Sequence, residues 1–184
     1  MKILFSAAST AACLLSHAAA LAANPVVASP DGRTTIEVAE DGSTFSVKRR
    51  GEAVIAPSPL GLDLADAQAL GPLVLESRSD TAEDRTIALV ATKAAAARDH
   101  YRGATLGFRE AGAGRRLFID LRAYDDGMAF RYRLDETAAV SLDGERTAFV
   151  PAGDPECLIS EFQGAHEVGF ERKHTSQLRP ARTH

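Results

Sequence analysis

One stretch of this sequence, residues 118–134 (FIDLRAYDDGMAFRYRL), constrains the fold more tightly than any other. Apolar and polar residues alternate on both sides of a short polar run, and a period of two is typical of strands with one buried face. Asp126 and Gly127 form the Asp-Gly pair that strongly indicates a two-residue hairpin loop. The stretch therefore predicts an antiparallel hairpin with one apolar face.

The two-residue loop also fixes which residues of the two strands face each other. The predicted apolar face contains three cross-strand pairs: Ala123 with Phe130, Leu121 with Tyr132, and Ile119 with Leu134. On the other face Asp120 falls opposite Arg133, and such a pair of unlike charges contributes about 0.2–1 kcal/mol. Arg122 falls opposite Arg131, which is a mild cost of this register. A slip of one residue would turn every apolar side chain of one strand outward, so the register is strongly specified.

The first 22 residues have the organisation of a secretory signal peptide. Lys2 supplies a positive charge, residues 3–15 form an apolar run, and Ala20-Leu21-Ala22 fits an A-x-A cleavage site. The apolar run is too short and too interrupted for a membrane-spanning helix. Cys13 would suit lipoprotein processing, but two leucines continue the apolar run past it and favour the ordinary signal peptide. We therefore expect a periplasmic or secreted protein.

Cleavage at this site leaves residues 23–184, which are enough for one domain with its own core. The formal net charge of −4 gives no support for nucleic acid or an anionic membrane as a partner. Cys13 leaves with the signal peptide, and Cys157 then has no internal partner. We expect no disulfide, and we interpret Cys157 as a small buried apolar side chain rather than a reactive one.

Short apolar runs separated by turn residues follow one another along the mature chain. The expected strands are residues 34–38, 45–47, 53–55, 62–64, 101–110, 115–124, 139–142, 147–150 and 158–159, with a rigid connector at 57–61. Turn signals lie between them, among them Pro30-Asp31-Gly32, Asp41-Gly42 and Gly112-Ala113-Gly114. Closely spaced turns with short strands predict an all-β fold, a sandwich or a barrel.

Residues 87–98 (IALVATKAAAAR) leave two structures open. Their strong helix formers favour a helix on propensity alone. Ile87, Leu89 and Ala91 also alternate with their neighbours, which favours a strand followed by an irregular turn.

No motif in the chain identifies an active site by its residues alone. HEVGF at 166–170 lacks the second histidine of a zinc-protease helix, because Phe170 occupies that position. Asp125-Asp126-Gly127 lacks the spaced oxygens of an EF-hand loop, and no G-x-S-x-G motif occurs. A glycosidase carboxylate pair is defined by a separation in space that the sequence does not give.

Several short motifs nevertheless occur in one order and spacing. They are SPDG at 29–32, PSPLGL at 57–62, RDHY at 98–101, LRAYDDGMAFRY at 121–132 and ERTAF at 145–149. Together they resemble the N-terminal domain of glycoside hydrolase family 97, which comprises exported α-glucosidases and α-galactosidases. The resemblance covers roughly residues 26–178. It implies an all-β super-sandwich of the galactose-mutarotase-like type over residues 23–178, with residues 179–184 beginning a linker to a (β/α)₈ barrel absent from this chain.

The resemblance also implies one metal ligand. The family has an aromatic residue, a glutamate and a second aromatic three residues on, and His166-Glu167-Val168-Gly169-Phe170 matches this with His in the first place. In the family this glutamate reaches the barrel and helps to bind calcium beside the catalytic carboxylates. Glu167 is therefore the expected calcium ligand, Glu161 is a weaker alternative, and a plain surface carboxylate is the competing interpretation. Hard Ca²⁺ prefers several oxygen ligands, so one glutamate cannot hold it alone.

The implied function is that of a non-catalytic, carbohydrate-binding accessory domain of a calcium-dependent α-glycosidase. Its partners would be the catalytic barrel and, through the whole enzyme, an α-linked oligosaccharide, while every catalytic residue would lie outside this chain. Two alternatives remain. A free-standing carbohydrate-binding module is weakened by the absence of Trp and the presence of only three Tyr. A non-functional remnant is the other.

Overall fold

The computed structural model describes residues 24–65, 70–90, 93–112, 114–135, 141–160 and 168–178. Regular structure within these ranges consists of strands and one short 3-10 turn, Thr175–Gln177. Among the described residues, no helix is long and apolar enough to cross a membrane.

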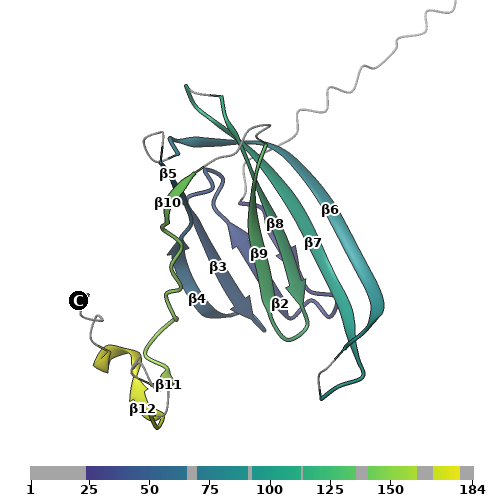
Figure 1. Ribbon diagram of the computed structural model, residues 1–184, viewed down its shortest axis with the longest axis vertical. Coiled ribbons are helices and arrows are strands. Elements are labelled where there is room, and N and C mark those ends of the chain that lie inside the picture. Colours follow the sequence, from purple (N-terminus) through teal and green to yellow (C-terminus); the bar gives the residue numbers. More distant parts are fainter. Residues whose placement is uncertain are drawn as a thin grey trace, which may run out of the picture.

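The strands form two larger sheets and two small ones, all antiparallel. The first sheet is a meander of β1 (Val26–Ala28), β2 (Thr34–Val38), β3 (Thr44–Arg49) and β4 (Glu52–Pro59). The second contains β6 (Leu73–Ala88), β7 (Ala96–Glu110), β8 (Arg116–Tyr124) and β9 (Met128–Leu134) in that order. The small sheets pair β5 (Leu62–Leu64) with β10 (Leu142–Glu145), and β11 (Glu156–Ile159) with β12 (Glu171–His174). Figure 1 shows β11 and β12 beside the main body.

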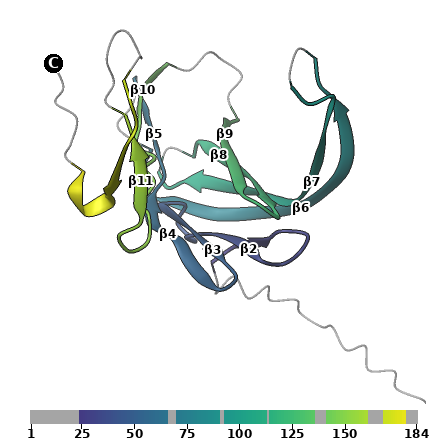
Figure 2. The same cartoon turned by 90° about the horizontal axis from the view of Figure 1, so that it is seen from below.

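The core lies between the two larger sheets, which face each other as the layers of a sandwich (Figures 1 and 2). Apolar side chains from alternate positions fill it: Ile36, Val38, Phe45 and Val47 from the first sheet, and Ala104, Leu106, Phe108, Leu117, Ile119, Leu121 and Ala123 from the second. Leu60 and Leu62, which follow β4, close one side of this cluster. The predicted all-β sandwich is confirmed.

Two features of β4 and the segment beside it differ from expectation. The rigid connector predicted from residue 57 begins later, because β4 continues through Pro57 and Pro59. β4 is an edge strand of its sheet, where a proline costs no internal hydrogen bond. Residues 147–150 form no strand, but they run along this edge and the amide of Ala56 donates to the carbonyl of Val150 at 2.8 Å.

The strand alternative for residues 87–98 is confirmed in its described part, and the helix alternative is wrong there. β6 ends at Ala88, β7 begins at Ala96, and the amide of Leu89 donates to the carbonyl of Ala95 at 3.0 Å. β6 itself has no counterpart among the expected strands. Beyond Leu75 it is exposed on both faces along most of its length, so its sequence lacks the alternation that marks a half-buried strand.

The predicted hairpin forms, but its predicted register is wrong by two residues. Ile119 pairs with Tyr132 and Leu121 with Phe130, in place of Leu134 and Tyr132. The remaining observed pairs of the apolar face are Leu117 with Leu134 and Ala123 with Met128. Because the shift is an even number of residues, every side chain keeps its predicted face.

The shift also changes the polar face. Asp120 pairs directly with Arg131, and Arg122 faces Ala129. The expected contact between two arginines is therefore avoided.

The shift in register follows from the position of the hairpin loop. Asp125 and Asp126 form this loop in place of Asp126 and Gly127, and the amide of Tyr124 donates to the carbonyl of Gly127 at 2.8 Å. An Asp-Gly loop favours a type I′ turn, which needs positive φ at both central residues, but Gly127 is not among the residues with positive φ and this turn does not form.

Asp125 joins the hairpin loop to the first sheet. Its carbonyl accepts a hydrogen bond from Arg49 at 2.5 Å, and its carboxylate accepts one from the amide of Asp31 at 2.9 Å. The loop is thereby held against the turn between β1 and β2.

Leu106 provides a test of the sandwich core, because it lies at the centre of β7 with no exposed surface. Leu106→Ala removes buried apolar volume and leaves a cavity, so we expect the free energy of unfolding to fall by about 2–5 kcal/mol. Urea denaturation measures this. Val74→Ala on β6, where the side chain is mostly exposed, should change it by less than about 0.5 kcal/mol. Equal effects of the two substitutions would contradict this core.

Candidate functional site

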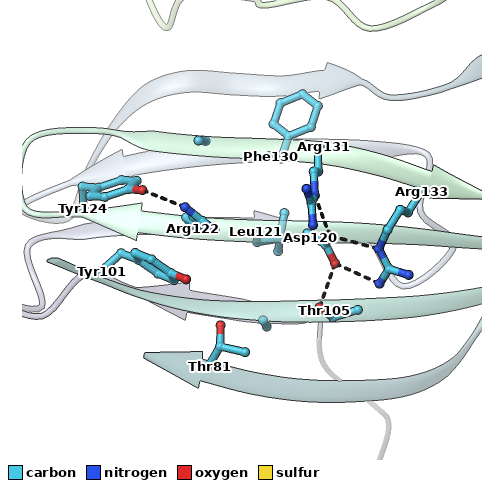
Figure 3. A pocket seen from close by; sticks show the side chains of 12 residues that line it. Thr81, Tyr101, Thr105, Asp120, Leu121, Arg122, Tyr124, Phe130, Arg131 and Arg133 are labelled. Atoms are coloured by element: carbon cyan, nitrogen blue, oxygen red, sulfur yellow. Dashed lines mark hydrogen bonds and ion pairs between the residues drawn. The ribbon is translucent and has the colours of Figure 1, made fainter. Parts of the chain in front are cut away.

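The two faces of the β6–β9 sheet differ in chemistry because side chains alternate along each strand. One face belongs to the core, and the other is concave and points away from β1–β4 (Figure 2). An open hollow of about 500 Å³ lies on this outer face. We call it the outer-face hollow, and it is lined by Thr81, Tyr101, Ala104, Thr105, Asp120, Leu121, Arg122, Tyr124, Ala129, Phe130, Arg131 and Arg133 (Figure 3).

Asp120 on β8 organises the charges at one end of the hollow. Its Oδ2 accepts hydrogen bonds from Nε of Arg131 at 2.8 Å and from Nε of Arg133 at 3.2 Å. Its Oδ1 accepts one from the Thr105 hydroxyl at 2.7 Å. Burial raises the pKa of this carboxyl, but the hydrogen bonds from Arg133, Arg131 and Thr105 outweigh burial and lower the pKa to about 2. Asp120 is therefore ionised at neutral pH.

The other end of the hollow carries two tyrosines and an arginine. The guanidinium carbon of Arg122 lies 4.3 Å from the ring centroid of Tyr101, which is a cation–π contact. The ring centroids of Tyr101 and Tyr124 are 5.5 Å apart. Asp99, nearly buried behind them, accepts hydrogen bonds from the Tyr124 hydroxyl at 3.1 Å and from Nη2 of Arg85 at 3.1 Å. These contacts hold the aromatic rings in fixed positions.

Two motifs that are distant in sequence meet at this end. In the register of β7 and β8, Tyr101 of RDHY pairs with Tyr124 of RAYDDG, and Gly103 pairs with Arg122. Glycine is required at position 103 because a Cβ there would lie 2.5 Å from the carbonyl oxygen of Leu121 and 2.8 Å from Oγ1 of Thr81. The sequence pattern predicts that these residues lie on strands but does not bring them together. The one sequence feature that pointed to this site is the alternation that assigns Arg122 and Tyr124 to the polar face.

The arrangement is suited to binding rather than to proton transfer at a free carboxylate. The lining of the hollow contains three arginines, Arg122, Arg131 and Arg133, and one carboxylate, that of Asp120, so the lining has an excess of positive charge. The carboxylate of Asp99 lies behind the lining, 3.9 Å from Nη1 of Arg122. Arginine presents a planar fork of donors that matches the two oxygens of a carboxylate. Across the part of the chain that the structure describes, no three His, Cys, Asp or Glu side chains gather closely enough to hold a metal ion.

The expected calcium ligand, Glu167, and its alternative, Glu161, lie outside the described residues, so both stay predictions. Phe170, which completes the motif around Glu167, is described and its side chain is exposed. Cys157 is only half-buried on β11, and its Sγ lies 3.8 Å from the carbonyl oxygen of Pro155. The expectation that it is a buried side chain is therefore wrong.

Comparison with known sequences identifies relatives over most of the chain. The family model of the glycosyl-hydrolase 97 N-terminal domain matches residues 27–184. A retaining alpha-galactosidase of Bacteroides thetaiotaomicron is 32% identical over 171 residues, which are 85% of this chain and 25% of that protein. A probable retaining alpha-galactosidase of Streptomyces bingchenggensis is 29% identical over 150 residues, 74% of this chain and 23% of that protein. The chain thus spans about a quarter of the length of these relatives.

Solved structures share the fold. A beta-arabinopyranosidase matches with a TM-score of 0.70 and 21% identity, over 80% of this chain and 26% of its own. A glycoside hydrolase family 97 enzyme from Pseudoalteromonas sp. strain K8, in complex with acarbose, matches with a TM-score of 0.67 and 19% identity, over 74% of this chain and 22% of its own.

The low pKa of Asp120 predicts a pH dependence of stability. Its ordinary value is 3.8 and its folded value is about 2, so its ionised form stabilises the folded state above pH 4 and this contribution disappears as the pH falls toward 2. Asp120→Asn should remove about 2 kcal/mol at neutral pH and flatten the loss of stability between pH 4 and 2. Urea denaturation at several pH values measures this. Asp126→Asn, at an exposed loop position, should keep the parental slope; an unchanged slope in Asp120→Asn would contradict the ion cluster.

Proposed function

The chain belongs to the glycosyl-hydrolase 97 N-terminal family, and from this premise we propose that it is a non-catalytic accessory domain of an exported α-glycosidase. One observation carries the proposal: the family match spans residues 27–184 of the chain, while the chain spans only about a quarter of its full-length relatives. General acid–base chemistry on a glycosidic bond needs two positioned carboxyl groups. We place both on a catalytic domain outside this chain.

We propose α-galactosides as the substrates of the whole enzyme, in preference to α-glucosides. Both relatives reported above are described as retaining alpha-galactosidases, one of them as probable, and one of them is 32% identical to this chain. The resemblances to the solved enzymes are at 19–21% identity and support the fold alone.

The exposed apolar side chains near the C-terminal end support a contact with a further domain. Phe149, Leu158 and Phe170 have 58%, 64% and 74% of their surfaces exposed. β11 and β12 pair only with each other among the described strands, and a two-stranded hairpin is marginally stable on its own in water. Exposed apolar side chains are typical of interaction surfaces, and the catalytic domain is the partner we propose.

We propose calcium as the metal of the whole enzyme, with Glu167 as this chain's ligand. A calcium site needs six to eight oxygen ligands, and the described residues offer no cluster of three acidic, His or Cys side chains. We place the remaining oxygens on the catalytic domain. The contribution of this chain would be one carboxylate.

Enzyme assays on the isolated chain test the accessory role. We expect no hydrolysis of an aryl α-galactoside or α-glucoside above background, because both catalytic carboxyl groups would be missing. A fusion in which this chain replaces the aligned segment of a family 97 α-galactosidase should hydrolyse the α-galactoside. Turnover by the isolated chain that one Asp or Glu substitution within it abolishes would refute the proposal.

Glu167→Gln in the same fusion tests the calcium ligand. Loss of a charged oxygen should weaken calcium binding and calcium-dependent activity, while leaving the urea midpoint of the calcium-free protein unchanged. Isothermal titration calorimetry with Ca²⁺ measures the affinity. Glu161→Gln is the matched control and should have little effect. Equal losses from the two substitutions, or no loss from Glu167→Gln, would show that the ligand is another residue.

A further inference from the structure

The outer-face hollow has the size of a site for a small molecule. Its volume of about 500 Å³ lies within the roughly 300–1,000 Å³ that is typical of ligand pockets. The floor is formed by the sheet itself at Ala104 and Leu121, whose side chains belong to the core. A ligand would therefore meet a surface that is already formed.

The charge of the hollow is opposite to that of the whole protein. The chain has a formal net charge of −4, whereas the hollow combines three arginines with one aspartate. Arg131 and Arg133 share the single carboxylate of Asp120, and 71% and 48% of their side chains are exposed. Arg122 at the other end is 42% exposed, and its Nη1 lies 3.9 Å from the nearly buried carboxylate of Asp99. The side chains thus present guanidinium groups to an incoming anion from both ends of the hollow (Figure 3).

Aromatic groups lie beside these cations. Tyr101 and Tyr124 line the hollow, and the Arg122 guanidinium lies over the Tyr101 ring, with Nη1 donating to the Tyr124 hydroxyl at 3.4 Å. Tyrosine offers an apolar ring and a polar hydroxyl at once, a combination that suits ligands with both C–H and O–H groups. The Thr81 and Thr105 hydroxyls are further polar groups of the lining.

We propose that the outer-face hollow binds a sugar residue that carries a carboxylate, of the uronic acid class. The carboxylate would pair with the guanidinium group of Arg131 at one end of the hollow. The ring would lie toward Tyr101 and Tyr124 at the other end, where Arg122 can donate to its hydroxyls. The choice of a saccharide as the source of the carboxylate rests on the proposed glycosidase function. Binding needs only the sandwich described above, so its failure would leave the accessory role intact, and the activity assays do not depend on it.

Titration of the purified chain with D-galacturonic acid, monitored by NMR, tests the proposal. We expect saturable shifts of the backbone signals of β7, β8 and β9 around the hollow. Galactose, which lacks the carboxylate, should bind at least about tenfold more weakly, because a hydrogen-bonded charge pair is lost. Acetate should also bind at least about tenfold more weakly, because it lacks the ring. Absence of saturable binding by galacturonic acid would overturn the proposal.

Arg131→Gln and Arg122→Gln should each weaken galacturonic acid binding by about tenfold. Arg98→Gln is the matched control, since Arg98 is also exposed and paired with an aspartate, Asp84, but does not line the hollow. Melting curves of all three variants establish that they fold. A folded Arg131→Gln and Arg122→Gln pair with parental affinity would overturn the assignment. Acetate binding as tightly as galacturonic acid, or tighter binding of an acidic peptide, would overturn the saccharide as the ligand.

Discussion

Alternation along β7, β8 and β9 puts every second side chain into the sandwich core, and the rest of the structure depends on this constraint. Leu106, Ile119 and Leu121 have almost no exposed surface, so the middle strands of the sheet cannot rotate or slip by one residue without exposing them. The intervening side chains are thereby fixed on the outer face. Packing on one side of the sheet determines the positions of the polar groups on the other.

The contact at Asp125 links the β8–β9 hairpin, and with it the outer face, to the first sheet. Its hydrogen bonds to Arg49 and Asp31 hold the β8–β9 loop against the β1–β2 turn. In the resulting register Asp120 lies opposite Arg131, and Arg122 lies opposite Ala129 instead of an arginine. One polar contact at the edge of the sandwich thus decides which charges meet at the outer-face hollow.

The chemistry of the chain is divided between two regions. The sandwich and its outer face are rigid, charged and aromatic, which suits the binding of a small ligand. The segment that carries β11 and β12 is rich in exposed apolar side chains, which suits contact with another domain. The proposed binding surface and the proposed docking surface would both serve the accessory role that we propose.

Local patterns in the sequence determined the fold class, the core face of residues 117–134 and several strand bounds, such as Thr34–Val38 and Leu62–Leu64. Periodicity depends only on neighbouring residues, and the apolar face it assigned survived a register shift of two. The tertiary structure decided the register, the existence of β6 and the meeting of Tyr101, Arg122 and Asp99. These features depend on contacts between residues far apart in the chain: the register on the link from Asp125 to the first sheet, and β6 on its pairing with β7. Pairing of that kind needs no alternation of apolar and polar residues within β6 itself.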